Sequence, residues 1–259
     1  MIVGLLHPGE MGASCGAQLR KAGHDVVWAS EGRGPGTQRR ALDAGLRDVG
    51  TVGAMVAEAE VIVSVCPPAA ALDVASQAAG FAGLYVDANA IAPATVRGVA
   101  DRLTPGGATV VDGGIIGPPP DQPGRTRLYL SGPRADEVAS WWEGTNVEAG
   151  VVGDSLGAAS ALKASYATWT KANTAMLLAI RAVAAAEGVD DALQAEWARS
   201  QPGMDTRSAQ ARNSAETKGW RWVGEMEEIG DLFAASGQPD GFLRAAAEVY
   251  RGYPRLPDA

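Results

Sequence analysis

The chain has 259 residues, of which 46% are hydrophobic and 20% charged, and this composition excludes a disordered or fibrous protein. A formal net charge of −8 gives no basis for binding the phosphates of a nucleic acid, and it argues against an anionic membrane surface as a partner. The two cysteines and two histidines lack metal-ligand spacing, so we expect no metal site and a reducing, cytoplasmic location.

Short β-rich runs alternate with helical segments in the first half of the chain. Strands are predicted at Ile2–Leu6, Asp25–Ala29, Val61–Val65, Leu84–Asp87 and Thr109–Asp112. Helices are predicted between them at Met11–Ala22, Thr37–Ala44, Ala69–Ala79 and Ala94–Leu103. Such alternation is typical of a parallel sheet with crossover helices, and we expect Thr126–Ser131 and Val147–Val152 to extend that sheet.

The second half of the chain is predicted to be helical throughout. Residues 158–187 contain no Gly or Pro and predict a single helix of about 45 Å. Apolar side chains recur along one of its faces at Leu162, Tyr166, Trp169, Met176 and Ile180. Further helices are predicted at Ala192–Arg199, Thr206–Lys218, Arg221–Ala235 and Gly241–Tyr250. The sequence thus predicts an α/β domain with a doubly wound, mostly parallel sheet at residues 1–152, and an all-α domain at 153–259.

A glycine-containing turn joins the first strand to the first helix. In the Rossmann fingerprint for dinucleotides, one glycine lets the pyrophosphate approach the backbone and a later one lets helix and strand pack closely. Gly9 and Gly12 fill these two places, whereas His7 stands where the fingerprint has its first glycine. An ordinary strand–helix turn would also contain glycines, but the position at the start of a βαβ series favours a cofactor site. We expect the contacts to come from His7, Pro8, Gly9, Glu10 and Met11.

The end of the second strand indicates which dinucleotide binds. An enzyme specific for NAD usually has an acid there to bind the ribose hydroxyls. Here Ser30 occupies that place, and Arg33 follows nearby, which suits the 2′-phosphate of NADP. Glu31 is either a solvated acid or a ribose contact. NADP is therefore the predicted cofactor, with NAD as the alternative.

Two further loops follow strands and are expected to face the cofactor, because ligands of open α/β sheets bind beyond the carboxyl ends of strands. The first contains Cys66, Pro67 and Pro68, and the second contains Asn89, which either contacts the cofactor or only turns the chain. Cys66 is interpreted as a small buried residue and not as a nucleophile. The Gly- and Pro-rich run after Asp112 is either a rigid loop that faces substrate or a stiff surface turn, and Asp112 itself is interpreted as structural.

Lys163 lies near the start of the predicted long helix. A lysine on a helix is usually a solvated charge, but Tyr166, Thr170 and Asn173 continue a polar stripe along its side of this helix. Such a stripe in a cleft between domains would be a place for proton transfer.

Together these residues resemble the β-hydroxyacid dehydrogenase superfamily, which includes 3-hydroxyisobutyrate dehydrogenases, the NADP domain of 6-phosphogluconate dehydrogenase, and imine reductases. The resemblance covers Gly4–Gly12, Gly23-His24, Asp87–Pro93, Asp112–Gly117 and Gly157–Lys163, in the order of the superfamily. The stretches Trp220–Trp222 and Glu225–Glu228 resemble a little-characterised branch with a shorter C-terminal domain.

The resemblance implies a hydride transfer between NADP and a small carbonyl or alcohol, with Lys163 as the general acid/base. Tyr166 stands where the superfamily has an asparagine, and Ile116-Gly117-Pro118 replaces a serine-glycine-glycine loop that grips a substrate carboxylate. The substrate is therefore expected to be bulkier or less acidic than hydroxyisobutyrate, in contact with Ile116, Gly117 and Thr170. The alternatives are an imine reductase-like enzyme or a catalytically silent NADP-binding protein. A homodimer formed through the helical domain is also expected.

Overall fold

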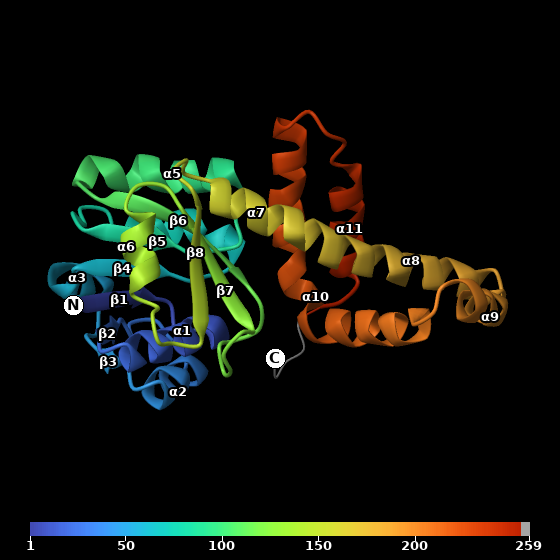
Figure 1. The fold of residues 1–259 in the computed structure, drawn as a ribbon, viewed down its shortest axis with the longest axis horizontal. Helices are drawn as coiled ribbons and strands as arrows, with labels where there is room; N and C mark the ends of the chain where they lie inside the picture. Colours follow the sequence, from blue (N-terminus) through green and yellow to red (C-terminus); the bar gives the residue numbers. More distant parts are fainter. Residues whose placement is uncertain (255–259) are drawn as a thin grey trace. The chain divides into compact units, whose positions relative to one another are not determined.

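The computed structural model describes residues 1–254 and divides into two compact units (Figure 1). The first, called the N-terminal unit, comprises Met1–Lys163, and the second, called the helical unit, begins at Ala164. The last strand of the first unit ends at Gly153, next to the boundary expected at 152/153, whereas the compact units divide further along, inside a helix.

One eight-stranded sheet forms the centre of the N-terminal unit, in the order β3-β2-β1-β4-β5-β6-β7-β8. The strands are β1 (Ile2–Leu6), β2 (Asp25–Trp28), β3 (Arg47–Asp48), β4 (Val61–Ser64), β5 (Leu84–Asp87), β6 (Thr109–Ile116), β7 (Thr126–Ser131) and β8 (Val147–Gly153). Neighbouring strands are parallel except β6 and β7, which are antiparallel. The predicted α/β class with a mostly parallel sheet is confirmed.

The predicted end of the fifth strand was wrong. We expected that strand to end at Asp112 and a loop or turn to follow, but β6 continues to Ile116 and pairs with β7 over this length. The glycines at positions 113 and 114 weaken a strand by propensity, yet antiparallel pairing with β7 over Asp112–Ile116 outweighs that preference. The turn comes only at Gly117, whose φ of 125° suits a residue without a side chain.

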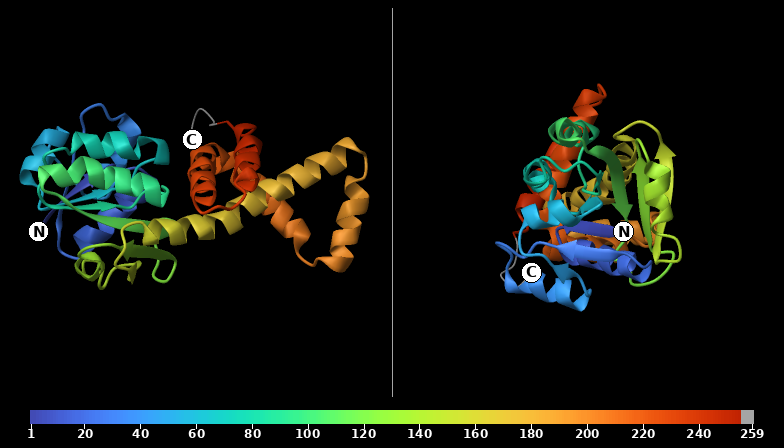
Figure 2. Two further views of the ribbon diagram at one scale, coloured as in Figure 1. Left: turned by 90° about the horizontal axis from the view of Figure 1, so that it is seen from above. Right: turned by 90° about the vertical axis from the view of Figure 1, so that its left-hand side faces the viewer.

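Helices cover both faces of the sheet, as a doubly wound fold requires (Figures 1 and 2). The helices of this unit are α1 (Glu10–Lys21), α2 (Pro35–Asp43), α3 (Val52–Glu58), α4 (Ala71–Gln77), α5 (Pro93–Leu103) and α6 (Ala135–Ser140). Val61 and Val63 of β4 belong to the same core as residues of α1, α2 and α6, whereas Ile62 belongs to a second core with residues of α3, α4 and α5. Alternate side chains of each buried strand thus enter two separate cores.

The helical unit consists of long helices, and two of the predicted boundaries in it were wrong. The elements are α7 (Ala158–Ala167, which begins in the N-terminal unit), a π-helical turn (Thr168–Ala172), α8 (Asn173–Ala186), α9 (Asp190–Ser200), α10 (Met204–Ala235) and α11 (Gly241–Arg251). The π-turn interrupts the single α-helix expected over 158–187. Conversely, α10 continues through Gly219, where we expected a break. A Cβ there would lie 3.1 Å from Tyr253 Cβ, so this glycine lets Tyr253 pack closely against the helix.

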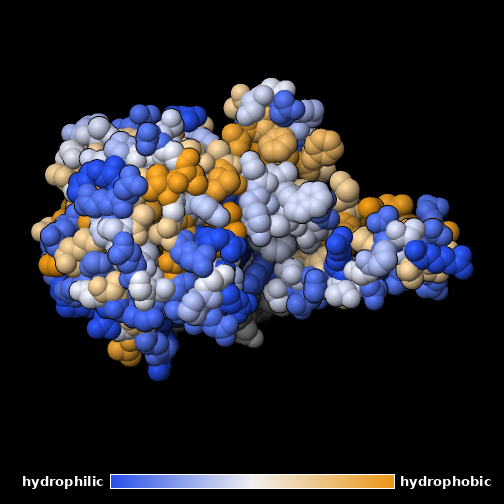
Figure 3. Space-filling model, in the orientation of Figure 1, coloured by the Kyte–Doolittle hydropathy of each residue, from blue (hydrophilic) through white to orange (hydrophobic). Residues whose placement is uncertain are grey.

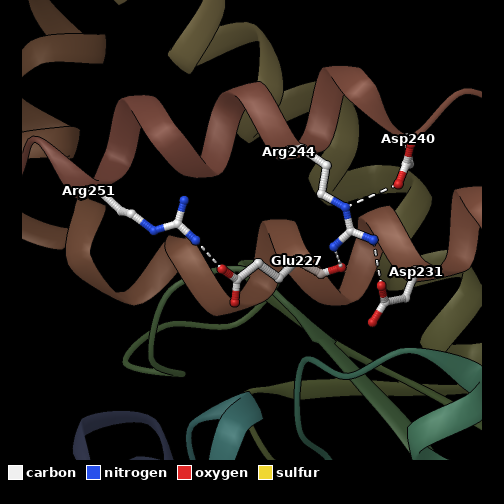
Figure 4. Close-up of polar contacts among 5 residues, drawn as sticks. All are labelled: Glu227, Asp231, Asp240, Arg244 and Arg251. Atoms are coloured by element: carbon white, nitrogen blue, oxygen red, sulfur yellow. Dashed lines mark hydrogen bonds and ion pairs between the residues drawn. The ribbon is translucent and has the colours of Figure 1, made fainter.

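Arg244 of α11 ties that helix to α10 (Figure 4). Its guanidinium donates to the Glu227 carbonyl oxygen at 3.2 Å and to Asp231 Oδ1 at 2.6 Å of α10, and to Asp240 Oδ2 at 3.1 Å at the start of its own helix. Arg251, two turns further along α11, pairs with the Glu227 carboxylate. Gly230 makes room for this arrangement, since a Cβ there would lie 2.9 Å from Arg244 Cζ.

Across residues 1–254, the structure contains no helix that is long and apolar enough to cross a membrane.

Candidate functional site

Four loops meet at the carboxyl edge of the parallel strands. The register places Leu6 of β1 beside Ser64 of β4, Ser64 beside Asp87 of β5, and Asp87 beside Asp112 of β6. The chain runs outward from β1 to β2 and β3, then returns to the other side of β1 as β4. The junction of β1 and β4 is therefore the topological switch point, where ligands of open α/β sheets bind. The loops after β1, β2, β4 and β5 all border this edge.

The turn after β1 has the shape that a dinucleotide-binding turn requires. A Cβ on Gly12 would lie 2.2 Å from the carbonyl oxygen of His7, so only glycine lets α1 begin this close to β1. At Gly9, by contrast, a Cβ would meet no atom within 4 Å, so the backbone there is open to an approaching group. Gly9 is also the N-cap of α1 and makes no side-chain capping bond. Helix N-termini of this kind favour phosphate.

His7 and Arg33 connect this turn with the loop after β2. Arg33 Nη2 lies 3.0 Å from His7 Nε2, and the backbone N–H of Arg33 donates to the carbonyl oxygen of Ser30 at 3.0 Å. Burial, and secondarily the positive charge of Arg33, lower the pKa of His7 to about 4. Arg40 also reaches the turn, with Nε donating to the carbonyl oxygen of Pro8 at 3.4 Å. Glu31, the acid that could have bound the ribose, is exposed. The structure thus gathers positive charge beside the first turn.

Asn89 joins the β4 and β5 loops from inside the protein. Its Oδ1 accepts the backbone N–H of Cys66 at 2.5 Å, while Nδ2 donates to Ser64 Oγ at 3.2 Å and to Asp87 Oδ2 at 3.0 Å. These bonds use both amide hydrogens, and the side chain is buried. This geometry favours a structural role for Asn89, in which it holds the loop that contains Pro67, over contact with a ligand.

Cys66 is placed as a small, partly buried side chain. Burial, followed by the negative charge of Asp87, raises the pKa of its thiol to about 12. A thiol with so high a pKa is a poor nucleophile. Pro67, exposed, and Pro68, half-buried, follow it and begin a short 3₁₀ turn over Pro68–Ala70.

Asp112 fixes the first turn of α7 to the sheet. Its carboxylate accepts three hydrogen bonds: from the backbone N–H of Ser160 at 2.9 Å, from Ser160 Oγ at 2.5 Å, and from Ser131 Oγ at 2.9 Å. The three residues are buried. Because Lys163 is one turn further along α7, this cluster determines where the lysine lies. The structural role expected for Asp112 matches these contacts.

Lys163 lies over β6. A Cβ on Gly114 would come within 3.0 Å of Lys163 Cβ and 2.9 Å of the carbonyl oxygen of Ala159, so the absence of a side chain at Gly114 lets α7 rest on the strand. The adjacent Gly113 is equally close to β5, since a Cβ there would lie 3.1 Å from the carbonyl oxygen of Asp87. The aliphatic part of the Lys163 side chain therefore lies at the same edge of the sheet as the loop after β5. It is half-buried.

The remaining predicted site residues are dispersed. Ile116 is buried at the end of β6, and the exposed Gly117 follows in the hairpin turn, where a Cβ would lie 2.2 Å from the carbonyl oxygen of Arg125. Tyr166 is exposed on α7. Thr170 lies in the π-turn and its hydroxyl donates to carbonyl oxygens of the preceding turn. The π-turn also gives later residues a different register from the continuous polar stripe that the sequence predicted. Glu10 is exposed and Met11 half-buried, both in the first turn of α1.

We did not predict a role for Ser64, Ser131, Ser160 or Gly114 from the sequence. The three serines form no local motif, because each becomes important only through a partner on another strand or helix. Gly114 had a weak signal, since two consecutive glycines in a strand often mark a close backbone approach. Across residues 1–254, no group of three or more His, Cys, Asp or Glu side chains could hold a metal ion.

Comparisons with known proteins agree with this architecture. Residues 184–253 match a family described as a domain of unknown function, DUF1932. An uncharacterized 28.5 kDa protein in the 7S RNA 5′ region of Methanothermus fervidus is 28% identical over 194 residues, which are 74% of each chain.

Solved structures resemble the chain over nearly its whole length. MTH1747, a conserved protein of unknown function described as structurally similar to 3-hydroxyacid dehydrogenases, has a TM-score of 0.70 and 27% identity, and the match covers 98% of this chain and 99% of that one. The 3-hydroxyisobutyrate dehydrogenase of Salmonella typhimurium has a TM-score of 0.71 at 15% identity, covering 97% and 93%. A reductive aminase from Aspergillus terreus, in complex with NADPH and ethyl levulinate, has a TM-score of 0.62 at 16% identity, covering 96% and 92%. These structures confirm the predicted resemblance to the hydroxyacid dehydrogenase fold.

Proposed function

We propose that this chain is an NADP-dependent oxidoreductase that transfers a hydride between the nicotinamide and a small carbonyl or alcohol substrate, with Lys163 as the general acid/base. The neighbours are dehydrogenases and reductases, which supports an NAD(P)-dependent oxidoreductase in general. The observation that carries the specific proposal is the position of Lys163. Its stem rests on Gly114 at the edge of the sheet that the β5 loop also borders, and the Asp112 cluster fixes the helix that bears it.

The first turn and the β2 loop fit a dinucleotide. Gly9 leaves space for the pyrophosphate beside the N-terminus of α1, and Gly12 makes the close packing of that helix possible. Arg33 supplies positive charge near Ser30, which favours NADP over NAD because the 2′-phosphate needs donors there. When bound, the nicotinamide supplies or accepts the hydride.

Lys163 has one task in this proposal, which is to move a proton. As the carbonyl is reduced, negative charge develops on its oxygen, and the ammonium of Lys163 donates a proton to that oxygen. In the reverse direction the neutral amine takes the proton from the alcohol. Tyr166, one turn along α7, is proposed as a second catalytic residue that orients the substrate or the ammonium.

The first test is the substitution Lys163→Ala, made after carbonyl, alcohol and imine compounds have been screened for an NADPH-linked change in absorbance. We expect turnover to fall by about 10²- to 10⁴-fold, the usual contribution of a positioned acid or base. The affinity for NADPH should stay within a few-fold of the original, as measured by nucleotide fluorescence. Lys163→Arg should recover little activity, because a guanidinium keeps its proton and cannot act as the base.

Near-normal turnover in Lys163→Ala would contradict the lysine assignment, and Tyr166→Phe would then be the next variant to measure. A failure of every compound with NADPH, despite tight nucleotide binding, would instead indicate a catalytically silent NADP-binding protein.

An imine is the second candidate substrate, since a reductive aminase is among the proteins of similar fold. The substrate screen distinguishes the two, because reduction of a cyclic imine without reduction of any carbonyl compound would favour imine reduction.

A further inference from the structure

The contact between His7 and Arg33 determines which nitrogen of His7 carries a proton. A guanidinium is always protonated and has donors only, so the 3.0 Å contact from Arg33 Nη2 requires His7 Nε2 to accept. A neutral imidazole that accepts through Nε2 carries its hydrogen on Nδ1. The low pKa of His7 keeps the ring neutral at ordinary pH. His7 therefore presents Nδ1–H as a donor.

Two buried donors of this pair have no partner inside the protein. Neither His7 Nδ1 nor Arg33 Nε has a hydrogen-bond partner among residues 1–254, although both atoms are buried. Leaving a buried donor unpaired costs about 1 to 3 kcal/mol. Each group is a donor, so a ligand that completes it must offer an acceptor, and beside the Arg33 guanidinium an anionic oxygen is favoured.

We propose that His7 and Arg33 act as one unit that binds the 2′-phosphate of NADP, and that His7 is thereby a specificity-determining residue of the cofactor site. Arg33 follows β2, where the adenosine ribose is read, and His7 holds that guanidinium through Nε2. His7, at the first position of the fingerprint where glycine is usual, thus contributes to recognition of the 2′-phosphate. This inference rests on the proposed function, because it assigns the residues that select its cofactor.

A phosphate placed at this pair would accept hydrogen bonds from Arg33, whose guanidinium His7 holds through Nε2. The Nδ1–H of His7 points away from that contact, so His7 acts on this phosphate by positioning Arg33. The free ribose hydroxyl of NAD carries no charge, so its hydrogen bond from Arg33 would lack the attraction between opposite charges that a phosphate adds. The pair should therefore raise affinity for nucleotides with a 2′-phosphate and leave affinity for those without it nearly unchanged.

The test compares two fragments, adenosine 2′,5′-bisphosphate and ADP, by isothermal titration calorimetry on the full-length protein. In His7→Phe, which retains a ring but neither nitrogen, affinity for adenosine 2′,5′-bisphosphate should fall about 10- to 100-fold, the value of a hydrogen bond to a charged group. Affinity for ADP should stay within about 3-fold. In His7→Gln, whose amide can both accept from Arg33 and donate, most of the bisphosphate affinity should be retained. His24→Phe and His24→Gln are matched controls at the other histidine, and both should leave the two affinities unchanged.

An equal loss for both fragments in His7→Phe would overturn the proposal, since it would indicate a role in the shape of the turn alone. A wild-type protein that binds NADPH, with His7→Phe binding the bisphosphate equally well, would overturn this inference and leave the proposed function standing. A wild-type protein that binds no nucleotide would overturn both. If His7→Phe does not fold, ¹⁵N spectroscopy of the wild-type histidines decides the matter. Protonation at Nδ1, with a change in that signal when the bisphosphate binds, is expected, and protonation at Nε2 would contradict the inference.

Discussion

At the scale of single residues, the glycines at positions 12 and 114 show how a missing side chain positions a site. Each is a place where one backbone approaches another element so closely that a Cβ would overlap it. Gly12 brings the N-terminus of α1 to the end of β1, and Gly114 brings α7, with Lys163, onto β6. Both glycines therefore contribute to the site by allowing a helix to pack closely against a strand.

The substitution Gly114→Ala tests this directly. The added methyl would lie 2.9 Å from the carbonyl oxygen of Ala159 and 3.0 Å from Lys163 Cβ, so α7 must move. We expect a loss of about 1 to 3 kcal/mol in the free energy of unfolding in urea, typical of overpacking. Where a substrate is known, turnover should fall up to about 10²-fold, the effect of misplacing a catalytic group by about 1 Å.

Gly150→Ala is the matched control, because this glycine also lies in a strand, β8, and a Cβ there would meet no atom within 4 Å. It should change stability by less than about 0.5 kcal/mol. Equal stability and turnover in both variants would show that α7 does not depend on the glycine.

At the scale of elements, the π-turn between α7 and α8 places Lys171 against α10. Its ammonium pairs with the carboxylate of Glu225 and lies 5.6 Å from the ring centroid of Trp222. Tyr250 of α11 donates its hydroxyl to the Lys171 carbonyl oxygen at 2.6 Å, and its ring packs edge-on against Trp222 at 5.0 Å. A π-turn leaves some carbonyl oxygens without their usual helical partner, and a hydroxyl from another helix can satisfy one of them. This contact joins three helices at one place.

Glu225→Leu should destabilise the protein by about 3 to 5 kcal/mol, because Lys171 would keep its charge without a partner in a largely buried place. The double variant Lys171→Met with Glu225→Leu should be nearly as stable as the original protein. The reason is that Oε1 of Glu225 is buried without a hydrogen-bond partner among residues 1–254, so the ion pair does not fully offset the cost of burying its charges. Urea unfolding measures both.

The exposed pair Arg134–Glu137 provides the comparison for this experiment. Glu137→Leu should cost less than about 1 kcal/mol, as surface ion pairs usually do. A double variant as unstable as Glu225→Leu alone would contradict the argument, because it would indicate that packing and not charge pairing is lost.

At the scale of the whole molecule, an apolar surface on the helical unit has no partner within the described chain. Exposed apolar side chains occur along α7, the π-turn and α8 at Tyr166, Trp169, Met176, Ile180 and Val183. In the space-filling view apolar residues are visible along the part of this unit that α8 forms (Figure 3). Apolar surfaces of this kind often mark interfaces between proteins. We propose that a second copy of this chain covers it, in the twofold dimer that is the commonest closed assembly.

Light scattering at micromolar concentration should therefore give twice the mass of a single chain. Replacing Trp169 and Met176 together by Glu should convert the dimer to monomers, because two charges would be buried at the interface. Phe242→Glu is the control, since Phe242 is similarly exposed on α11 and lies outside this surface. A wild-type mass equal to one chain would rule the dimer out.

Local patterns were enough to predict most of the N-terminal sheet. Alternating strands and helices, each bounded by turn residues, specify a parallel sheet because the periodicity of each segment is set by the side chains that it buries. The short β3 and helices α3 and α6 were missed. Both residues of β3, Arg47 and Asp48, are exposed, so the strand has no apolar signal and exists only because it pairs with β2.

The sequence by itself determined the α/β and all-α halves, because continuous periodicities carry them. It also predicted a dinucleotide site at the turn around Gly9 and Gly12 from a short motif, and an acid/base at Lys163 from a family resemblance. Only the tertiary structure decided how distant side chains combine. Asn89 was ambiguous until its amide was seen to bond to Ser64, and the pairing of His7 with Arg33 follows from two loops brought to one edge of the sheet. Hydrogen-bond partners on different strands leave no periodic signal along the chain, so only the fold that brings them together could reveal them.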